Sequence, residues 1–133
     1  MRSWLVATAL VLACGTARAT DEGWTPSAWT GASTVELRTD CPDEGEHWFP
    51  VWLAVLDGDL YVRLGKKAAA RVACTRSAPY LGVRIAGRTF DRVRMVPAPE
   101  MADRVAAAMH ERYWFDVVVR YVPHPLTLRL VPE

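Results

Sequence analysis

The sequence has no excess of basic over acidic residues, or of acidic over basic ones. Its 133 residues include 16 Lys and Arg against 15 Asp and Glu, and Lys66 and Lys67 are the only lysines. Proteins that bind nucleic acids or anionic membranes through electrostatics usually show a basic patch or a large positive net charge. The near-balance therefore gives no reason to expect either kind of partner.

Motifs of the common hydrolases are also missing. The three histidines, His47, His110 and His124, are scattered, none belongs to an HExxH motif, and no GxSxG sequence surrounds a serine. Zinc sites need closely spaced His, Cys or carboxylate ligands, and acyl transfer needs an activated nucleophile. The sequence thus predicts no catalytic side chain and no metal site. It leaves redox enzymes open, because a bound flavin brings its own chemistry.

The N-terminus has the features of a secretory signal. An apolar run over residues 4–13 follows a basic residue, and Ala-Arg-Ala ends the segment with small residues at the spacing that signal peptidase requires. We predict a signal peptide over residues 1–19, cut after Ala19, and one domain over residues 20–133. The sequence Val-Leu-Ala-Cys that ends at Cys14 leaves a second interpretation open, a lipoprotein acylated at this cysteine.

Two cysteines, Cys41 and Cys74, remain after cleavage at Ala19. In an oxidising compartment such a pair can form a disulfide. The chain-entropy relation gives a bridge of this loop length a stabilisation of roughly 3–4 kcal/mol. The sequence leaves the alternative open that both are separate thiols, with Cys74 as a small core-facing residue of a helix.

Apolar and alternating segments predict six β-strands, and turn residues separate them. Asp57-Gly58 and Ala86-Gly87 each predict a hairpin turn. The fold class is therefore mainly β with some α, a six-stranded antiparallel barrel with two short helices and one longer helix. The strands are expected at 35–38, 48–56, 60–64, 80–85, 89–96 and 126–131.

Three segments allow more specific expectations. The apolar stretch 48–56 predicts a central strand buried on both faces, with a bulge or an unpaired edge at Pro50, because proline cannot donate a ladder hydrogen bond. The preceding residues 39–47 contain four acidic side chains, a proline and a glycine, which predicts a solvated loop. Residues 115–122 are ambiguous between strand and helix.

The segment Gly65-Lys66-Lys67 has an unusual charge for the start of a helix. It opens a predicted helix over residues 66–75, although cations at a helix N-terminus oppose the helix dipole. An anion bound there would remove the conflict, because it would accept backbone N–H groups and ammonium charges together. Arg63 and Arg71 are near enough in sequence to contribute. The other interpretation is that both lysines point into water.

The order of several features along the chain matches a known pattern. The features are, in order, Pro50-Val51-Trp52, the Asp-Gly hairpin, Leu60-Tyr61-Val62-Arg63, the glycine-basic step, a short helix and Gly82-Val83-Arg84-Ile85. This order resembles the split β-barrel of the pyridoxamine phosphate oxidase-like superfamily, whose members bind FMN or a deazaflavin. The ending 126–132 after a long helix is similar to a branch of short bacterial split-barrel proteins. The resemblance covers roughly residues 24–132.

The resemblance implies a homodimer with a cofactor between its subunits. It places the flat ring of the cofactor against the strand 50–54 and the phosphate beside the basic groups after the third strand. The cofactor-binding residues that it implies are Val51, Trp52 and Leu53 at the ring and Arg63, Lys66 and Lys67 at the phosphate.

Sequence and resemblance together predict an exported, periplasmic or secreted protein that binds FMN, a deazaflavin or another flat anionic ligand, with small-molecule oxidoreductase activity as the implied reaction. One alternative is a cofactor-free periplasmic or lipid-anchored binding protein on the same barrel. Another is a haem-binding barrel, in which a histidine would be the axial ligand.

Overall fold

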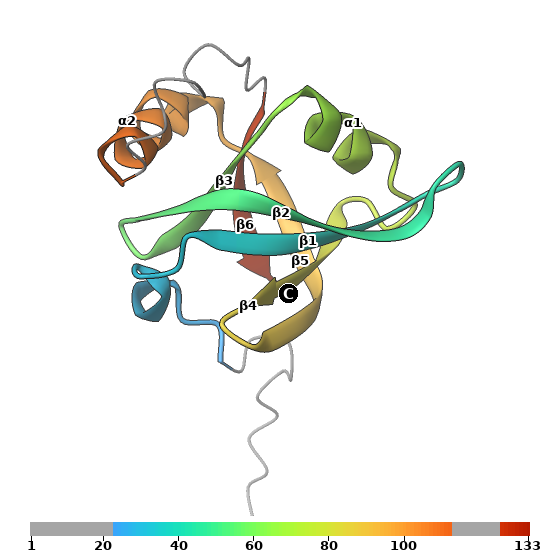
Figure 1. The fold of residues 1–133 in the computed structure, drawn as a ribbon, viewed down its shortest axis with the longest axis horizontal. Coiled ribbons are helices and arrows are strands. Elements are labelled where there is room, and N and C mark those ends of the chain that lie inside the picture. The colour runs from blue at the N-terminus through green and yellow to red at the C-terminus, as the bar shows by residue number, and fades with distance from the viewer. Residues whose placement is uncertain (1–22, 113–125) are drawn as a thin grey trace, which may run out of the picture.

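All six strands of the barrel are antiparallel to their neighbours, as Figure 1 shows for the computed structural model. The structure describes residues 23–112 and 126–133, so the predicted segments 1–19 and 115–122 lie outside it. The strands are β1 (Thr34–Cys41), β2 (Gly45–Leu56), β3 (Asp59–Leu64), β4 (Tyr80–Ile85), β5 (Arg88–Pro97) and β6 (Leu126–Pro132). The helices are the 3-10 turns η1 (Pro26–Trp29) and η2 (Pro99–Met101) and the α-helices α1 (Lys66–Cys74) and α2 (Ala102–Arg112).

The strands close into a barrel in the order β1-β2-β3-β6-β5-β4, and β4 pairs again with β1. Leucine, valine and phenylalanine side chains from every strand fill the interior. The predicted fold class, a mainly β six-stranded antiparallel barrel with helices, is therefore confirmed. Closure pairs the strand edges that an open sheet would expose.

Two tight hairpins follow directly from local sequence. Asp57 and Gly58 have φ of 52° and 79°, and Ala86 and Gly87 have φ of 50° and 76°. Positive φ at both central residues is the mark of a type I′ turn, whose twist matches that of the flanking strands. Glycine at the second position adopts this backbone without a steric penalty. Both predicted hairpins are confirmed.

The predicted loop over residues 39–47 is wrong. β1 continues to Cys41 and β2 starts at Gly45, so only three residues form the turn between them. Thr39 and Cys41 point inward and are buried, whereas the acidic residues of the two strands alternate with them on the outer face. Acidic side chains are compatible with a strand when the alternation places them in water, which is why their number misled the prediction.

The expectation that β2 is buried on both faces is also wrong. Phe49, Leu53 and Ala54 are the buried residues of this strand, and the rest of its side chains are half-buried or exposed. The physical reason is a change of partner along the strand. Residues 45–52 of β2 pair with β1, and residues 53–56 pair with β3.

A second, smaller apolar cluster lies outside the barrel, under α2. Val105 and Met109 of this helix are buried against Ala54 of β2 and Tyr61 of β3. They are four residues apart and therefore lie on one face of the helix. This packing anchors α2 next to β3, the strand whose end leads into α1.

Candidate functional site

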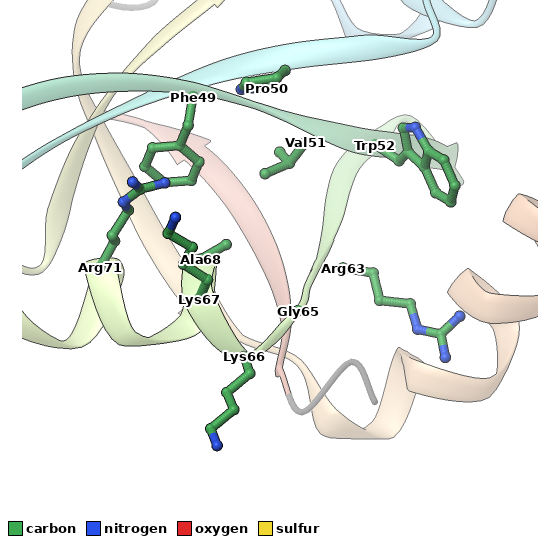
Figure 2. Close-up of a pocket in the computed structure, with 10 residues that line it drawn as sticks. All are labelled: Phe49, Pro50, Val51, Trp52, Arg63, Gly65, Lys66, Lys67, Ala68 and Arg71. Atoms are coloured by element: carbon green, nitrogen blue, oxygen red, sulfur yellow. The ribbon is translucent and has the colours of Figure 1, made fainter. Parts of the chain in front are cut away.

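A cleft opens where β2 changes partner. The residues of β2 before Leu53 have no strand on the side toward β3 within the described part of the chain, because β3 joins β2 only at the Leu53–Val62 pair. β3 instead runs into Gly65 and α1, which form the opposite wall (Figure 2). The resulting pocket has a volume of about 590 Å³. Its lining residues are Phe49, Pro50, Val51, Trp52, Arg63, Gly65, Lys66, Lys67, Ala68 and Arg71.

One wall of the pocket is apolar. Phe49 and Val51 point from β2 toward α1 and also pack on the barrel core, while Trp52 packs on the cluster under α2. Pro50 pairs in register with Glu36 of β1, without a bulge, and its other side faces the gap. Because proline has no N–H, it is tolerated on a strand that has an open edge. This wall can bind an apolar ring.

The other wall is cationic and contains the start of α1. The first α-helical hydrogen bond joins the Ala69 N–H to the Gly65 carbonyl at 2.8 Å, so the N–H groups of residues 66–68 have no acceptor within the helix. Gly65 has no side chain to cap them, and the first turn contains no acidic residue. Backbone donors at a helix N-terminus bind anions well, and here they line a pocket.

Four basic side chains line the pocket, and none of the described lining residues is acidic. Within residues 23–112 and 126–133, Arg63, Lys66 and Lys67 take part in none of the ion pairs. Arg71 is different, because it is already paired outside the pocket. The pocket thus combines a positive surface with an apolar wall, which is the arrangement that a flat anionic ligand needs.

The four cations do not point the same way. Figure 2 shows Lys67 extending toward Phe49 and Arg71, whereas Lys66 extends away from β2 and Arg63 extends toward α2. Lys67 and Arg71 are four residues apart on α1 and therefore lie on one helix face. Lys66 is turned about 100° from Lys67 around the helix axis. Lys67 and Arg71 are therefore the cations placed to act together.

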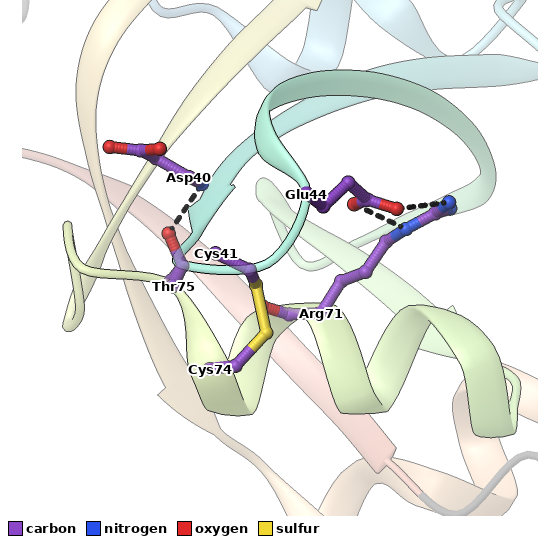
Figure 3. Close-up of polar contacts among 6 residues, drawn as sticks. All are labelled: Asp40, Cys41, Glu44, Arg71, Cys74 and Thr75. Atoms are coloured by element: carbon purple, nitrogen blue, oxygen red, sulfur yellow. Dashed lines mark hydrogen bonds and ion pairs between the residues drawn. A yellow bond between two sulfur atoms is a disulfide. The ribbon is translucent and has the colours of Figure 1, made fainter.

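Arg71 connects the pocket to the β1–β2 turn. Its Nε and one Nη donate to the two carboxylate oxygens of Glu44, both at 3.1 Å, as Figure 3 shows. The Arg71 guanidinium also lies 5.0 Å from the ring centre of Phe49 (Figure 2). These hydrogen bonds stabilise the charged carboxylate and lower the pKa of Glu44 below its ordinary value. The arrangement fixes the orientation of the guanidinium at the end of the pocket.

A disulfide between Cys41 and Cys74 joins the same two segments, with their Cα atoms 5.3 Å apart. Cys41 ends β1 and Cys74 ends α1, so the covalent link lies next to the Glu44–Arg71 pair (Figure 3). The Asp40 N–H also donates to Thr75 Oγ1 at 2.8 Å. The turn and the helix that carries Lys67 and Arg71 are thus held together at three points.

Five of the six residues that the resemblance placed at a cofactor line this pocket. They are Val51, Trp52, Arg63, Lys66 and Lys67. The sixth, Leu53, is fully buried in the barrel core and is not a lining residue. It sits where β3 has joined β2, so the gap has already closed at this position.

Two lining residues that matter for the geometry were outside the implied set. Phe49 lies two positions before Val51 and therefore on the same face of β2, and Arg71 lies four positions after Lys67 on the same face of α1. The strand period could have identified Phe49, whereas Arg71 was already expected from the sequence to contribute to the anion site at the helix start. Nothing in the sequence signals Glu44, because its partner lies 27 residues away on another element.

Comparisons with known proteins support the fold. Comparison with protein-family models gave no match, and neither did comparison with curated protein sequences. Among solved structures, the heme storage protein HutZ from Vibrio cholerae is similar with a TM-score of 0.56 and 16% identity over 80% of this chain and 87% of that chain. The conserved hypothetical protein Rv2991 from Mycobacterium tuberculosis has a TM-score of 0.56 and 20% identity over 81% of this chain and 78% of that chain. The resemblance to split-barrel proteins is confirmed at the level of the fold.

Proposed function

We propose that the pocket between β2 and α1 binds a flavin-type cofactor, FMN or a deazaflavin, or a similar flat anionic ligand. The observation that carries the proposal is the pairing of an apolar wall, formed by Phe49, Val51 and Trp52, with a cationic wall that contains an uncapped helix start. A volume of about 590 Å³ lies in the range of small-molecule sites.

Each wall has a separate task in this proposal. The ring lies against Val51 and Trp52, where apolar contact excludes water from one of its faces. The phosphate accepts hydrogen bonds from Lys67, Arg71 and the free N–H groups at the start of α1. When bound, a flavin supplies two-electron transfer to or from a small organic substrate. The residues of this chain bind and orient the ring, and the activity is that of a small-molecule oxidoreductase.

The direct test is the absorbance spectrum of the purified protein, recorded before and after addition of FMN, a reduced deazaflavin and haem in turn. We expect a retained or acquired flavin-type band, with riboflavin as the control that has the ring and lacks the phosphate. Binding of none of the three compounds would favour the alternative, a cofactor-free binding protein on the same barrel.

Haem is the less suitable ligand for this pocket. Among the described residues that line it there is no His, Cys, Met or Tyr, the side chains that ligate haem iron. His47 lies beside the pocket rather than in it and stacks on Phe49 with the ring centres 6.2 Å apart. We therefore expect haem to bind more weakly than the flavins in the same titration.

Export and dimer formation complete the proposal. Export is supported by the signal-like N-terminus and by the Cys41–Cys74 disulfide, since disulfides persist in oxidising compartments. In the described ranges, no helix is long and apolar enough to cross a bilayer. A homodimer is what the family resemblance implies, and it would cover the half-buried Val51 and Trp52.

Native mass spectrometry of the protein purified from a bacterial periplasm tests both points. We expect a chain that begins at Thr20 and a complex of two chains. A chain that begins with an acylated Cys14 would establish the lipoprotein interpretation instead. An uncleaved chain in the cytoplasmic fraction would contradict export, and a single chain at micromolar concentration would contradict the dimer.

A further inference from the structure

Glu44 forms an ion pair with Arg71, whose guanidinium lies beside Lys67 in the pocket (Figure 2). Both of its carboxylate oxygens accept hydrogen bonds from Arg71 at 3.1 Å, in a fork geometry. The side chains of Arg71 and Glu44 are 16% and 33% exposed, so water reaches the carboxylate more than the guanidinium. Arg71 is at the same time a lining residue of the pocket. A ligand anion at this end therefore meets a cation that already has a carboxylate beside it.

The backbone of Glu44 cannot move far from α1. Its N–H donates to the Cys41 carbonyl at 3.1 Å within the short turn, and Cys41 is bonded to Cys74 at the end of α1. On the other side of this link, the Arg76 N–H donates to the Asp40 carbonyl at 2.9 Å. A ligand thus cannot displace the turn as a unit, and the carboxylate stays within reach of Arg71.

The three charged side chains that meet at this end of the pocket, Lys67, Arg71 and Glu44, carry a net charge of one positive. Lys67 and Arg71 contribute two positive charges, and Glu44 removes one of them, which leaves one. Arg71 is the main group that stabilises the Glu44 carboxylate, and His47 and Lys67 add weaker electrostatic contributions. A second negative charge on the ligand would be opposed by Glu44, because like charges at short range repel even where water partly screens them.

We propose that Glu44 is a specificity-determining residue: by holding Arg71, it disfavours a ligand group with two negative charges, such as a phosphate monoester, relative to a group with one, such as a phosphate diester. The inference rests on the proposed function, because it concerns the anionic group of the ligand in the same pocket. It adds the charge class of that group, which the resemblance to flavin-binding barrels leaves open.

The test compares Glu44→Gln with wild type and with Asp43→Asn. The control variant removes one negative charge from the neighbouring, exposed residue of the same turn, which has no ion pair among the described residues. The ligands are FMN with a phosphate monoester, riboflavin 4′,5′-cyclic phosphate with a diester, and riboflavin with neither. Dissociation constants come from titrations followed by flavin fluorescence, and circular dichroism establishes that each variant is folded.

We expect Glu44→Gln to tighten FMN binding by roughly threefold to tenfold, as removal of one nearby like charge predicts. The gain for the cyclic phosphate should be smaller, riboflavin should not change, and Asp43→Asn should have little effect on any of them. Weaker FMN binding by Glu44→Gln would overturn the inference and make Glu44 a residue that positions Arg71. Equal gains for the two phosphates, or for the two variants, would also overturn it.

A failure of the proposed function can be told apart from a failure of this inference. If the wild type and both variants bind none of the three flavins, the flavin proposal fails. Methyl phosphate and dimethyl phosphate, titrated by NMR at millimolar concentration, then decide about Glu44. Stronger binding of methyl phosphate by Glu44→Gln than by wild type would support the inference, and equal binding or no binding of methyl phosphate by either protein would overturn it.

Discussion

Removing the Cys41–Cys74 disulfide is expected to lower the free energy of unfolding by about 3–4 kcal/mol. The two cysteines are 33 positions apart, and the cross-linked segment contains β2, β3 and α1. In the chain-entropy model, loss of the cross-link gives the unfolded chain the freedom of this whole segment. A loss of this size is a large fraction of the roughly 5–15 kcal/mol that stabilises an ordinary domain.

The measurement is urea unfolding of the oxidised wild type and of the Cys41→Ala/Cys74→Ala variant. A shift of the thermal midpoint on the order of 10 °C should accompany the change in free energy. Addition of a reductant provides the control, because it should destabilise the wild type and leave the variant unchanged. Identical unfolding free energies for the oxidised wild type and the variant would show that the link contributes nothing to stability.

Lys67→Ala is expected to weaken FMN binding by roughly 10- to 100-fold, and Lys66→Ala by less than about threefold. Lys67 extends toward Arg71 and Phe49 inside the pocket, whereas Lys66 extends away from β2. A hydrogen bond between charged groups contributes about 1.5–3 kcal/mol, which corresponds to one to two factors of ten in the dissociation constant. A charge that points into water is largely screened.

The two lysine variants control for each other. Each removes one positive charge from adjacent positions of the same helix turn, and alanine favours the helix at both positions, so neither should unfold the protein. Titration of each variant with FMN, with riboflavin as the ligand that lacks a phosphate, gives the comparison. Equal losses for Lys66→Ala and Lys67→Ala would mean that the phosphate senses only the net charge of the helix start. No loss for either variant would place the phosphate elsewhere.

Local sequence was sufficient wherever a short-range rule decides the structure. The Asp57-Gly58 and Ala86-Gly87 turns were predicted because positive φ at two successive residues is a local requirement. The six strands could be found for a similar reason, since the alternation that marks a strand is visible along the chain. The resemblance further implied five of the residues that line the pocket, including Val51 and Lys67.

Prediction failed where a residue's environment depends on distant partners. The acidic residues of 39–47 suggested a loop, but β1 and β2 pair through most of this region, which places Asp40 and Glu46 on the outer face and leaves only Asp43 and Glu44 in the turn. β2 seemed buried on both faces because its composition is apolar. Its exposure is set by the position at which β3 joins it, and this position is a property of the barrel rather than of the strand.

The mainly β class, the tight hairpins and the unusual pair of lysines at a helix start could be predicted from the sequence, because each depends on residues within a few positions of one another. Three features became known only from the three-dimensional structure: β2 parts from β3 to open a pocket, Lys67 rather than Lys66 extends toward β2, and Glu44 pairs with Arg71. These features require elements far apart in the chain to meet. Their geometry follows from strand pairing and barrel closure, which no local pattern specifies.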